Sequence, residues 1–182
     1  MLHDLMARVA DELDGPWAAS VLPNDAVSLH TPDHDLLVVR QDPDGRLVFH
    51  GIPASGLGSH WPRDGKNPLR HRITVSPAKS PARIASELSH RLLPAYRITL
   101  AVALAAHKAA RHERADATRA LAAISRLLDT TVEDRTVRLT GPSSHLTGTI
   151  TIAAGEATFH LRLPTHHATT LAQAVRPFRA PR

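Results

Sequence analysis

The 182-residue sequence contains no cysteine. This excludes disulfide bonds, thiolate catalysis, iron–sulfur clusters and cysteine-ligated zinc. Aromatic residues are also scarce, at 3% of the chain. The core therefore has to be built from Leu, Val, Ile and Ala, and few side chains are available for stacking on nucleic-acid bases. Lysine occurs only as Lys66, Lys79 and Lys108, and all other basic residues are arginine. Together with the Ala, Leu, His and Pro content, this composition is typical of a high-GC bacterium.

Long hydrophobic runs are missing as well. The longest run, residues 98–106, is interrupted by Thr99 and is too short to span a bilayer. Residues 1–15 carry acids where a signal peptide needs a basic start and an apolar stretch. We therefore expect a soluble, cytoplasmic protein with no membrane contact. At 42% apolar and 21% charged residues, the composition lies in the range of ordinary globular domains.

Positive and negative charges are unevenly distributed along the chain. The net charge is +5, but residues 1–60 hold three Lys or Arg against nine Asp or Glu, whereas residues 61–120 hold twelve against four. An acidic start beside a basic middle indicates either an anionic partner or two parts of the chain that attract each other.

Two stretches of the chain match each other at an offset of 110 residues. The matched residues are Val27, Leu29, Pro32, Leu36, Gly45, Phe49 and His50 in the first stretch, and Val137, Leu139, Pro142, Leu146, Gly155, Phe159 and His160 in the second. Apolar residues at helical spacing precede and follow each stretch. This pattern predicts an internal duplication of α-β-β-β-α units with a pseudo-twofold relation. The units would occupy residues 1–93 and 120–182, with a helical connector at 94–119.

Apolar and polar residues alternate within each unit. Leu47 and Phe49 oppose Val48 and His50, and the second unit repeats this pattern with Phe159 on the side expected to be buried. A period of two is typical of an antiparallel sheet with one buried face. Hairpin turns are predicted at residues 42–45 and 153–155, and an extra strand at residues 17–22. The sequence thus predicts an α+β fold with one or two antiparallel sheets and helices on one face.

The two units differ by an insertion at residues 54–72, which is rich in Gly and Pro and is expected to be a long irregular loop. After it, Ser80 and Pro81 have the pattern of a helix N-cap and first-turn proline. Pro94 is expected to break or kink this helix. Two further helices are expected, one ending near His112 and one from about residue 115 to residue 129.

Basic residues gather in the insertion and in the helices that follow it. Guanidinium and ammonium groups at high local density suit phosphate groups. The candidate anion-binding residues are Trp61, Arg63, Lys66, Arg70, His71, Arg72, Lys79, Arg83, Lys108, Arg111 and Arg114. The alternative is a solvated basic surface, or one that pairs with the acidic first sixty residues.

Two further features bear on nucleic acid. Residues 76–79 and 80–83 read Ser-Pro-Ala-Lys and Ser-Pro-Ala-Arg. These eight residues resemble the Ser-Pro-x-Lys/Arg repeats of histone tails, which implies contact with the DNA minor groove. The open sheet faces would carry Ser28, His30, Arg46 and His50 in one unit and Arg138, Thr140, Thr149, Thr151, Thr158, His160 and Arg162 in the other. These faces hold no aromatic side chain, so a solvated face is the alternative.

No motif for catalysis, cofactor or metal is present. The segment from Ser55 to His60 lacks the ending of a P-loop, and no pair of carboxylates lies in an evident apolar pocket. Among thirteen histidines, the best local set is His30 and His34 with Asp33 and Asp35, and it has the wrong secondary structure for a helical histidine pair. We expect a non-enzymatic binding module whose basic middle engages an anionic partner, with nucleic acid as the first candidate. The alternative is a chaperone-like, immunity or other interaction protein that binds an acidic protein or a second copy of itself.

Overall fold

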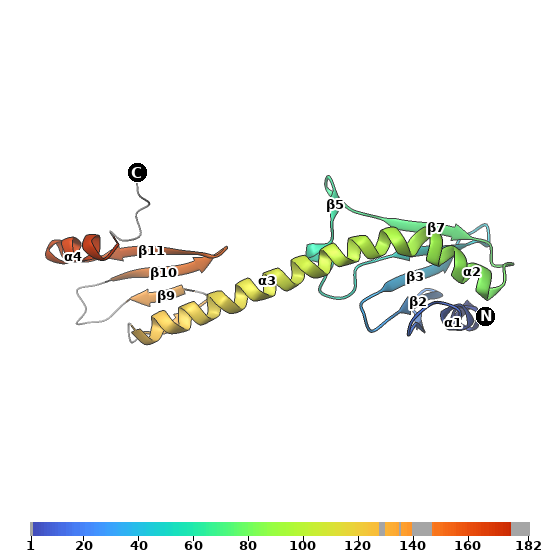
Figure 1. Ribbon diagram of the computed structural model, residues 1–182, viewed down its shortest axis with the longest axis horizontal. Coiled ribbons are helices and arrows are strands. Elements are labelled where there is room, and N and C mark those ends of the chain that lie inside the picture. The colour runs from blue at the N-terminus through green and yellow to red at the C-terminus, as the bar shows by residue number, and fades with distance from the viewer. Residues whose placement is uncertain (1, 128–129, 135, 140–146, 176–182) are drawn as a thin grey trace. The chain divides into compact units, whose positions relative to one another are not determined.

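The computed structural model has a mixed α+β fold with antiparallel sheets and one long helix (Figure 1). It describes residues 2–127, 130–134, 136–139 and 147–175. The chain forms two compact units, residues 1–108 and 109–182. The boundary between them falls inside the long helix α3 (Leu93–Leu127), and each unit is described by itself.

Unit 1 contains a five-stranded antiparallel sheet with the strand order β1-β2-β3-β4-β7. The strands are β1 (Ala18–Leu22), β2 (Ala26–His30), β3 (Leu36–Gln41), β4 (Leu47–Gly51) and β7 (His71–Val75). The predicted turn at residues 42–45 is confirmed, since the Gly45 N–H donates to the Asp42 carbonyl at 2.9 Å and Gly45 has a φ of +78°. The extra strand predicted at residues 17–22 is confirmed as β1.

Helices cover one face of this sheet (Figure 1): α1 (Leu2–Asp11), α2 (Pro81–Glu87) and the first part of α3. The side chains that enter the helix-covered core alternate along the strands as predicted, although Ser28 and Val48 on the opposite face are also buried. For example, Leu47 and Phe49 lie in the core with Ile73 and Val75 of the neighbouring strand. Their alternate neighbours, including His50, therefore lie on the opposite face.

The insertion at residues 54–72 is more ordered than the sequence indicates. It contains a 3₁₀ turn (η1, Gly58–His60) and a small hairpin of β5 (Arg63–Asp64) and β6 (Asn67–Pro68), which stands away from the five-stranded sheet (Figure 1). The last strand of the sheet begins at His71, inside the predicted loop. The expectation of an irregular loop up to residue 72 is therefore wrong, because its final residues pair with β4.

The helical region behaves differently from the prediction at two points. Ser80 caps α2 as predicted, and its side chain accepts from the Arg83 N–H. Before Pro94, however, the helix neither stops nor restarts: it widens into a π-helical turn (η2, Leu88–Leu92), in which the Leu93 N–H donates to the Leu88 carbonyl. The two helices expected on either side of residue 115 are one helix, since residues 95–127 contain no Gly or Pro and are rich in alanine. Over the described residues, none of the helices has an apolar stretch that could cross a membrane.

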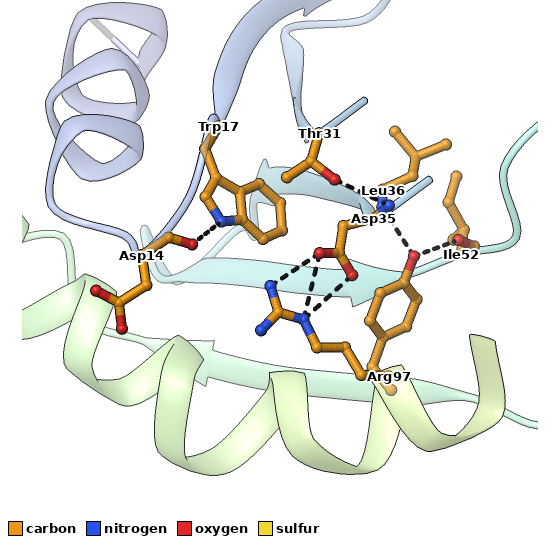
Figure 2. Close-up of polar contacts among 8 residues, drawn as sticks. Asp14, Trp17, Thr31, Asp35, Leu36, Ile52 and Arg97 are labelled. Atoms are coloured by element: carbon orange, nitrogen blue, oxygen red, sulfur yellow. Dashed lines mark hydrogen bonds and ion pairs between the residues drawn. The ribbon is translucent and has the colours of Figure 1, made fainter. Parts of the chain in front are cut away.

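Tyr96 of α3 holds the end of the β3–β4 ladder together (Figure 2). Its hydroxyl accepts from the Leu36 N–H at 2.8 Å and donates to the Ile52 carbonyl at 3.2 Å. Its ring is fully buried and lies directly on Gly51, where an added Cβ would come within 2.4 Å of a ring carbon. Burial raises the pKa of Tyr96 to about 12.

An ion pair ties the β2–β3 connection to the same helix. Arg97 donates to both carboxylate oxygens of Asp35, with the shortest distance 2.8 Å (Figure 2). Asp35 is buried, and its N–H donates to the Thr31 hydroxyl at 3.2 Å. Asp35 thus fixes the connection between the two strands through both its backbone N–H and its carboxylate.

Unit 2 contains a four-stranded antiparallel sheet with the order β11-β10-β9-β8, followed by α4 (Thr165–Val175). Its strands are β8 (Val132–Glu133), β9 (Thr136–Leu139), β10 (Thr147–Ala153) and β11 (Glu156–Arg162). Ala117 and Leu121 of α3 pack on β9 and β10. Phe159, which was expected to be buried, is 55% exposed. It lies on β11, an edge strand of this sheet, where Leu161 is partly buried against the core.

The two units share a three-stranded antiparallel meander, formed by β2-β3-β4 and by β9-β10-β11. Their registers differ by one residue, since Phe49 pairs with Val39 but Phe159 pairs with Ile150. The matched Pro142 and Leu146, and Thr140 of the predicted open face, lie outside the described residues. The internal duplication therefore stays a hypothesis.

Candidate anion-binding site

Strand β7 separates two residues that the sequence places in one basic loop. Arg72 pairs with His50 of β4 and therefore lies on the face of the sheet opposite the helices. His71 lies on the helical side, where its Nε2 is 2.9 Å from the Thr99 hydroxyl oxygen. The strand thus places the arginine toward solvent and the histidine toward the helices.

On the face opposite the helices, basic residues from three parts of the chain meet. His50 pairs with Val38 on one side and with Arg72 on the other. Arg40 lies two residues from Val38, diagonal to His50 on the same face. Arg70 comes two residues before Arg72. We call Arg40, His50, Arg70 and Arg72 the basic face.

The arginines of the basic face, Arg40, Arg70 and Arg72, are exposed and are not engaged in ion pairs within the described part of the chain. His50 is half-buried between them. Its pKa lies below the usual 6.5, first because of burial and then because Arg72, Arg40 and Arg70 repel a fourth positive charge. The sheet itself places two of these arginines beside His50: Arg72 pairs with it directly, and Arg40 pairs with Val48, two residues away on the same strand.

The aromatic member of the predicted site lies in the interior. Trp61 is 3% exposed, and its Nε1 donates to the Leu69 carbonyl at 3.0 Å. Its ring contacts those of His71 and Tyr96, with centroid distances of 6.2 and 5.9 Å. Burial lowers the pKa of His71. Both residues therefore anchor the insertion to the core and do not lie with the exposed arginines.

The other predicted cations are spread over several elements. Arg63 and Lys66 are exposed on the β5–β6 hairpin, which leads into Arg70. Lys79 forms an ion pair with Glu87, which also pairs with Arg91 at 2.8 Å.

The two Ser-Pro-Ala-Lys/Arg segments have local structural roles. The Ser76 hydroxyl accepts from the Ala78 N–H, and Ser80 caps α2. Arg83 is exposed in the first turn of that helix. The serines and Lys79 are thus already engaged within the chain, whereas Arg83 is not paired with an acid in the described residues.

The basic run on α3 forms no compact cluster. Lys108, Arg111 and Arg114 are all exposed. At about 100° of rotation per residue, Lys108 and Arg114 lie about 120° apart around the helix. They can line a broad surface, but they do not converge on one ligand group.

A hollow of about 390 Å³ lies beside the Asp35–Arg97 ion pair. It is lined by Asp14, Gly15, Pro16, Thr31, Asp33, Asp35, Arg97, Leu100, Ala101 and Leu104. Its one cationic group, Arg97, is already bound to Asp35 on two donors, so this hollow is poorly suited to an anion.

Metal-binding groups do not gather in the described ranges. His60 and His107 touch edge to face, with ring centroids 5.3 Å apart. However, no three His, Cys, Asp or Glu residues in these ranges are arranged to hold a metal ion.

Arg40 is the member of the basic face that the sequence interpretation missed. The sequence does contain this information. If the chain turns at residues 42–45, Arg40 lies opposite Val48, which is two residues from His50 on the same face. Arg40 belongs to no run of basic residues along the chain, whereas a sheet brings charges together across its strands.

Comparison of the chain with protein-family models, curated proteins and solved structures gave no match.

Proposed function

We propose that this chain is a non-enzymatic, cytoplasmic binding protein whose basic face holds an anionic partner, with nucleic acid as the first candidate. The observation that carries the proposal is a group of three exposed arginines around His50 in unit 1, none of which forms an ion pair within the described residues. Guanidinium groups bind phosphate oxygens in a bidentate manner and remain charged at every physiological pH.

The aromatic side chains favour contact with the phosphate backbone over contact with bases. In the described residues, Trp17, Phe49, Trp61 and Tyr96 are buried and Phe159 alone is exposed. Base stacking therefore has no platform beside the basic face. We expect binding that depends little on nucleotide sequence and strongly on salt.

Fluorescence anisotropy with labelled single-stranded and duplex DNA and RNA tests the proposal. Three neutralised phosphates give a slope of log K against log salt of about −2 for single strands and about −3 for duplex DNA. The triple variant Arg40→Gln/Arg70→Gln/Arg72→Gln should remove most of this slope. Arg8→Gln, an exposed arginine on α1, is the control and should retain it.

A second triple variant tests whether the nucleic acid binds at the basic face or at α3. Lys108→Gln/Arg111→Gln/Arg114→Gln removes the same charge from α3. A larger loss in this variant than in the sheet variant would overturn the assignment to the basic face. Absence of binding to any of the nucleic acids at low salt would overturn the proposal itself.

A protein partner is the second candidate. Ile98 and Val102, one turn apart on α3, are 69% and 54% exposed. Exposed apolar side chains next to each other are typical of protein contacts. The partner would be an acidic protein or a second copy of this chain. Light scattering and co-purification distinguish this candidate by a stoichiometric complex that is free of nucleic acid.

We also propose that the two units descend from a duplication and have diverged in function. Their shared meander and the residues matched at an offset of 110 support this. The matched partner of His50 is His160. Within the meander His50 pairs with Val38 and His160 pairs with Thr149. On its other side His50 pairs with Arg72 of β7, whereas β11 is an edge strand of the described sheet. The arginine cluster is therefore a property of unit 1, and anion binding is assigned to that unit.

A further inference from the structure

His50 lies at the centre of the basic face. It pairs directly with Arg72, and Arg40 lies diagonally across on β3. Directly paired side chains have Cβ atoms about 5 Å apart and diagonal ones about 7–8 Å. The imidazole is therefore within reach of any anion that the arginines hold.

The groups around His50 are cationic or uncharged on every neighbouring strand. Val38 of β3 lies beside it, and Ser28 of β2 lies beyond Val38 in the same row. Along β4 its neighbour on this face is Val48, which pairs with Arg40 on one side and with Thr74 on the other. Asp42, in the β3–β4 turn, accepts the backbone N–H of Arg46 at 2.7 Å.

In the free protein these neighbours keep His50 neutral. Burial and the three arginines lower its pKa below 6.5, so the imidazole is uncharged at neutral pH. An anion bound among the same arginines raises the pKa of His50 again, because its negative charge offsets the positive charge of the arginines. The anion also accepts a hydrogen bond from an imidazolium N–H.

We propose that His50 takes up one proton from solvent when a phosphate group binds to the basic face, and so becomes the fourth cationic group of the site. This inference rests on the proposed function and adds a ligand-binding residue and a control by pH. Binding then consumes a proton, and affinity increases as the pH falls. The increase is confined to the range between the lowered pKa of free His50 and its higher pKa in the complex, and it is at most about tenfold per pH unit for one proton.

The test measures the affinity for a labelled oligothymidylate, at fixed ionic strength, from about pH 8 to about pH 5. We expect wild-type affinity to rise by about tenfold over this range, which corresponds to a pKa change of one unit. His50→Gln should lose most of this rise, whatever its affinity near pH 8. His30→Gln removes another imidazole from the same sheet and should behave as wild type.

A second measurement uses the unmodified protein. The ring-proton resonance of His50, followed by NMR against pH, should titrate at a higher pH when the oligothymidylate is bound. An unchanged titration of His50 in the complex, or a His50→Gln variant with the wild-type pH dependence, would overturn the inference while binding itself persists. Absence of binding at every pH would overturn the proposed function together with it.

Discussion

Replacement of Tyr96 by phenylalanine tests how the long helix is joined to the sheet. The change keeps the buried ring and removes the hydroxyl that bridges Leu36 and Ile52. A backbone N–H and a backbone carbonyl then lose their partner at the end of the β3–β4 ladder. We expect a loss of about 1–3 kcal/mol in the free energy of unfolding. For a domain of about 100 residues, each kcal/mol lowers the unfolding midpoint by about 4–8 °C.

Tryptophan fluorescence is a selective assay for this change. Trp17 and Trp61 are the two tryptophans of the chain, and both lie in the core of unit 1, so their signal follows the unit that contains Tyr96. The control is Gln41→Met, which removes an exposed hydrogen bond to the Gly45 carbonyl and should change stability by less than about 0.5 kcal/mol. A midpoint for Tyr96→Phe equal to that of wild type would refute the bridging role.

Alkaline titration gives an independent measurement of the same site. Tyr96 is the one tyrosine of the chain, and its pKa in the folded protein is about 12 against 10.0 for an exposed tyrosine. The unfolded chain therefore loses this proton first, and stability that is present below about pH 10 is lost between about pH 10 and pH 12. Tyrosinate absorbance and loss of native fluorescence should appear together. Ionisation near pH 10 in a protein with native fluorescence would contradict the buried environment.

Two further changes test neighbouring contacts with the same fluorescence assay. Gly51→Ala places a Cβ against the ring of Tyr96 and should cost about 1–3 kcal/mol through overpacking. Gly58→Ala, with no atom within 4 Å of the added Cβ, is its control, and equal effects of the two would count against the close contact. Arg97→Met leaves the buried Asp35 without its cation and should cost up to about 3 kcal/mol, whereas adding Asp35→Asn should recover part of this loss. Strictly additive effects would show that the two side chains are not coupled.

Local features of the fold could be predicted from the sequence because short-range chemistry determines them. The turn at residues 42–45 needs a glycine with positive φ, and Gly45 has it. The start of α2 depends on Ser80 and Pro81, which act within one helical turn. The alternation of Leu47 and Phe49 in β4 requires only that one face of the strand join the core. In each of these cases, the cause lies within a few residues of the effect.

The site was less predictable because it depends on contacts between distant residues. Arg40 and Arg72 belong to one surface only because β3 and β7 both pair with β4. His71 and Arg72 differ in surroundings because one residue along a strand reverses the face. Phe159 is exposed although it pairs with the buried Ile150, and the strand pattern alone contains no information on how far the core extends over an edge strand.

The π-helical turn corresponds to a pattern of apolar residues in the sequence. Ile84, Leu88, Leu92, Tyr96 and Leu100 are all buried and are spaced four residues apart. In a regular α-helix, each step of four residues drifts by about 40° around the axis. Four such steps would take the last residue far from the face of the first. The wider turn at residues 88–92 absorbs part of this drift.

This turn also makes the length of the segment as important as its composition. If one residue were deleted between Leu88 and Leu92, a regular helix could form, and everything after it would turn by about 100° relative to α2. Tyr96 would leave its place against Gly51, and Arg97 would leave Asp35. Substitutions in this segment change only the local side chains. Insertions and deletions there change the phase of the whole helix, so we expect evolution to conserve its residue count more strictly than its residue types.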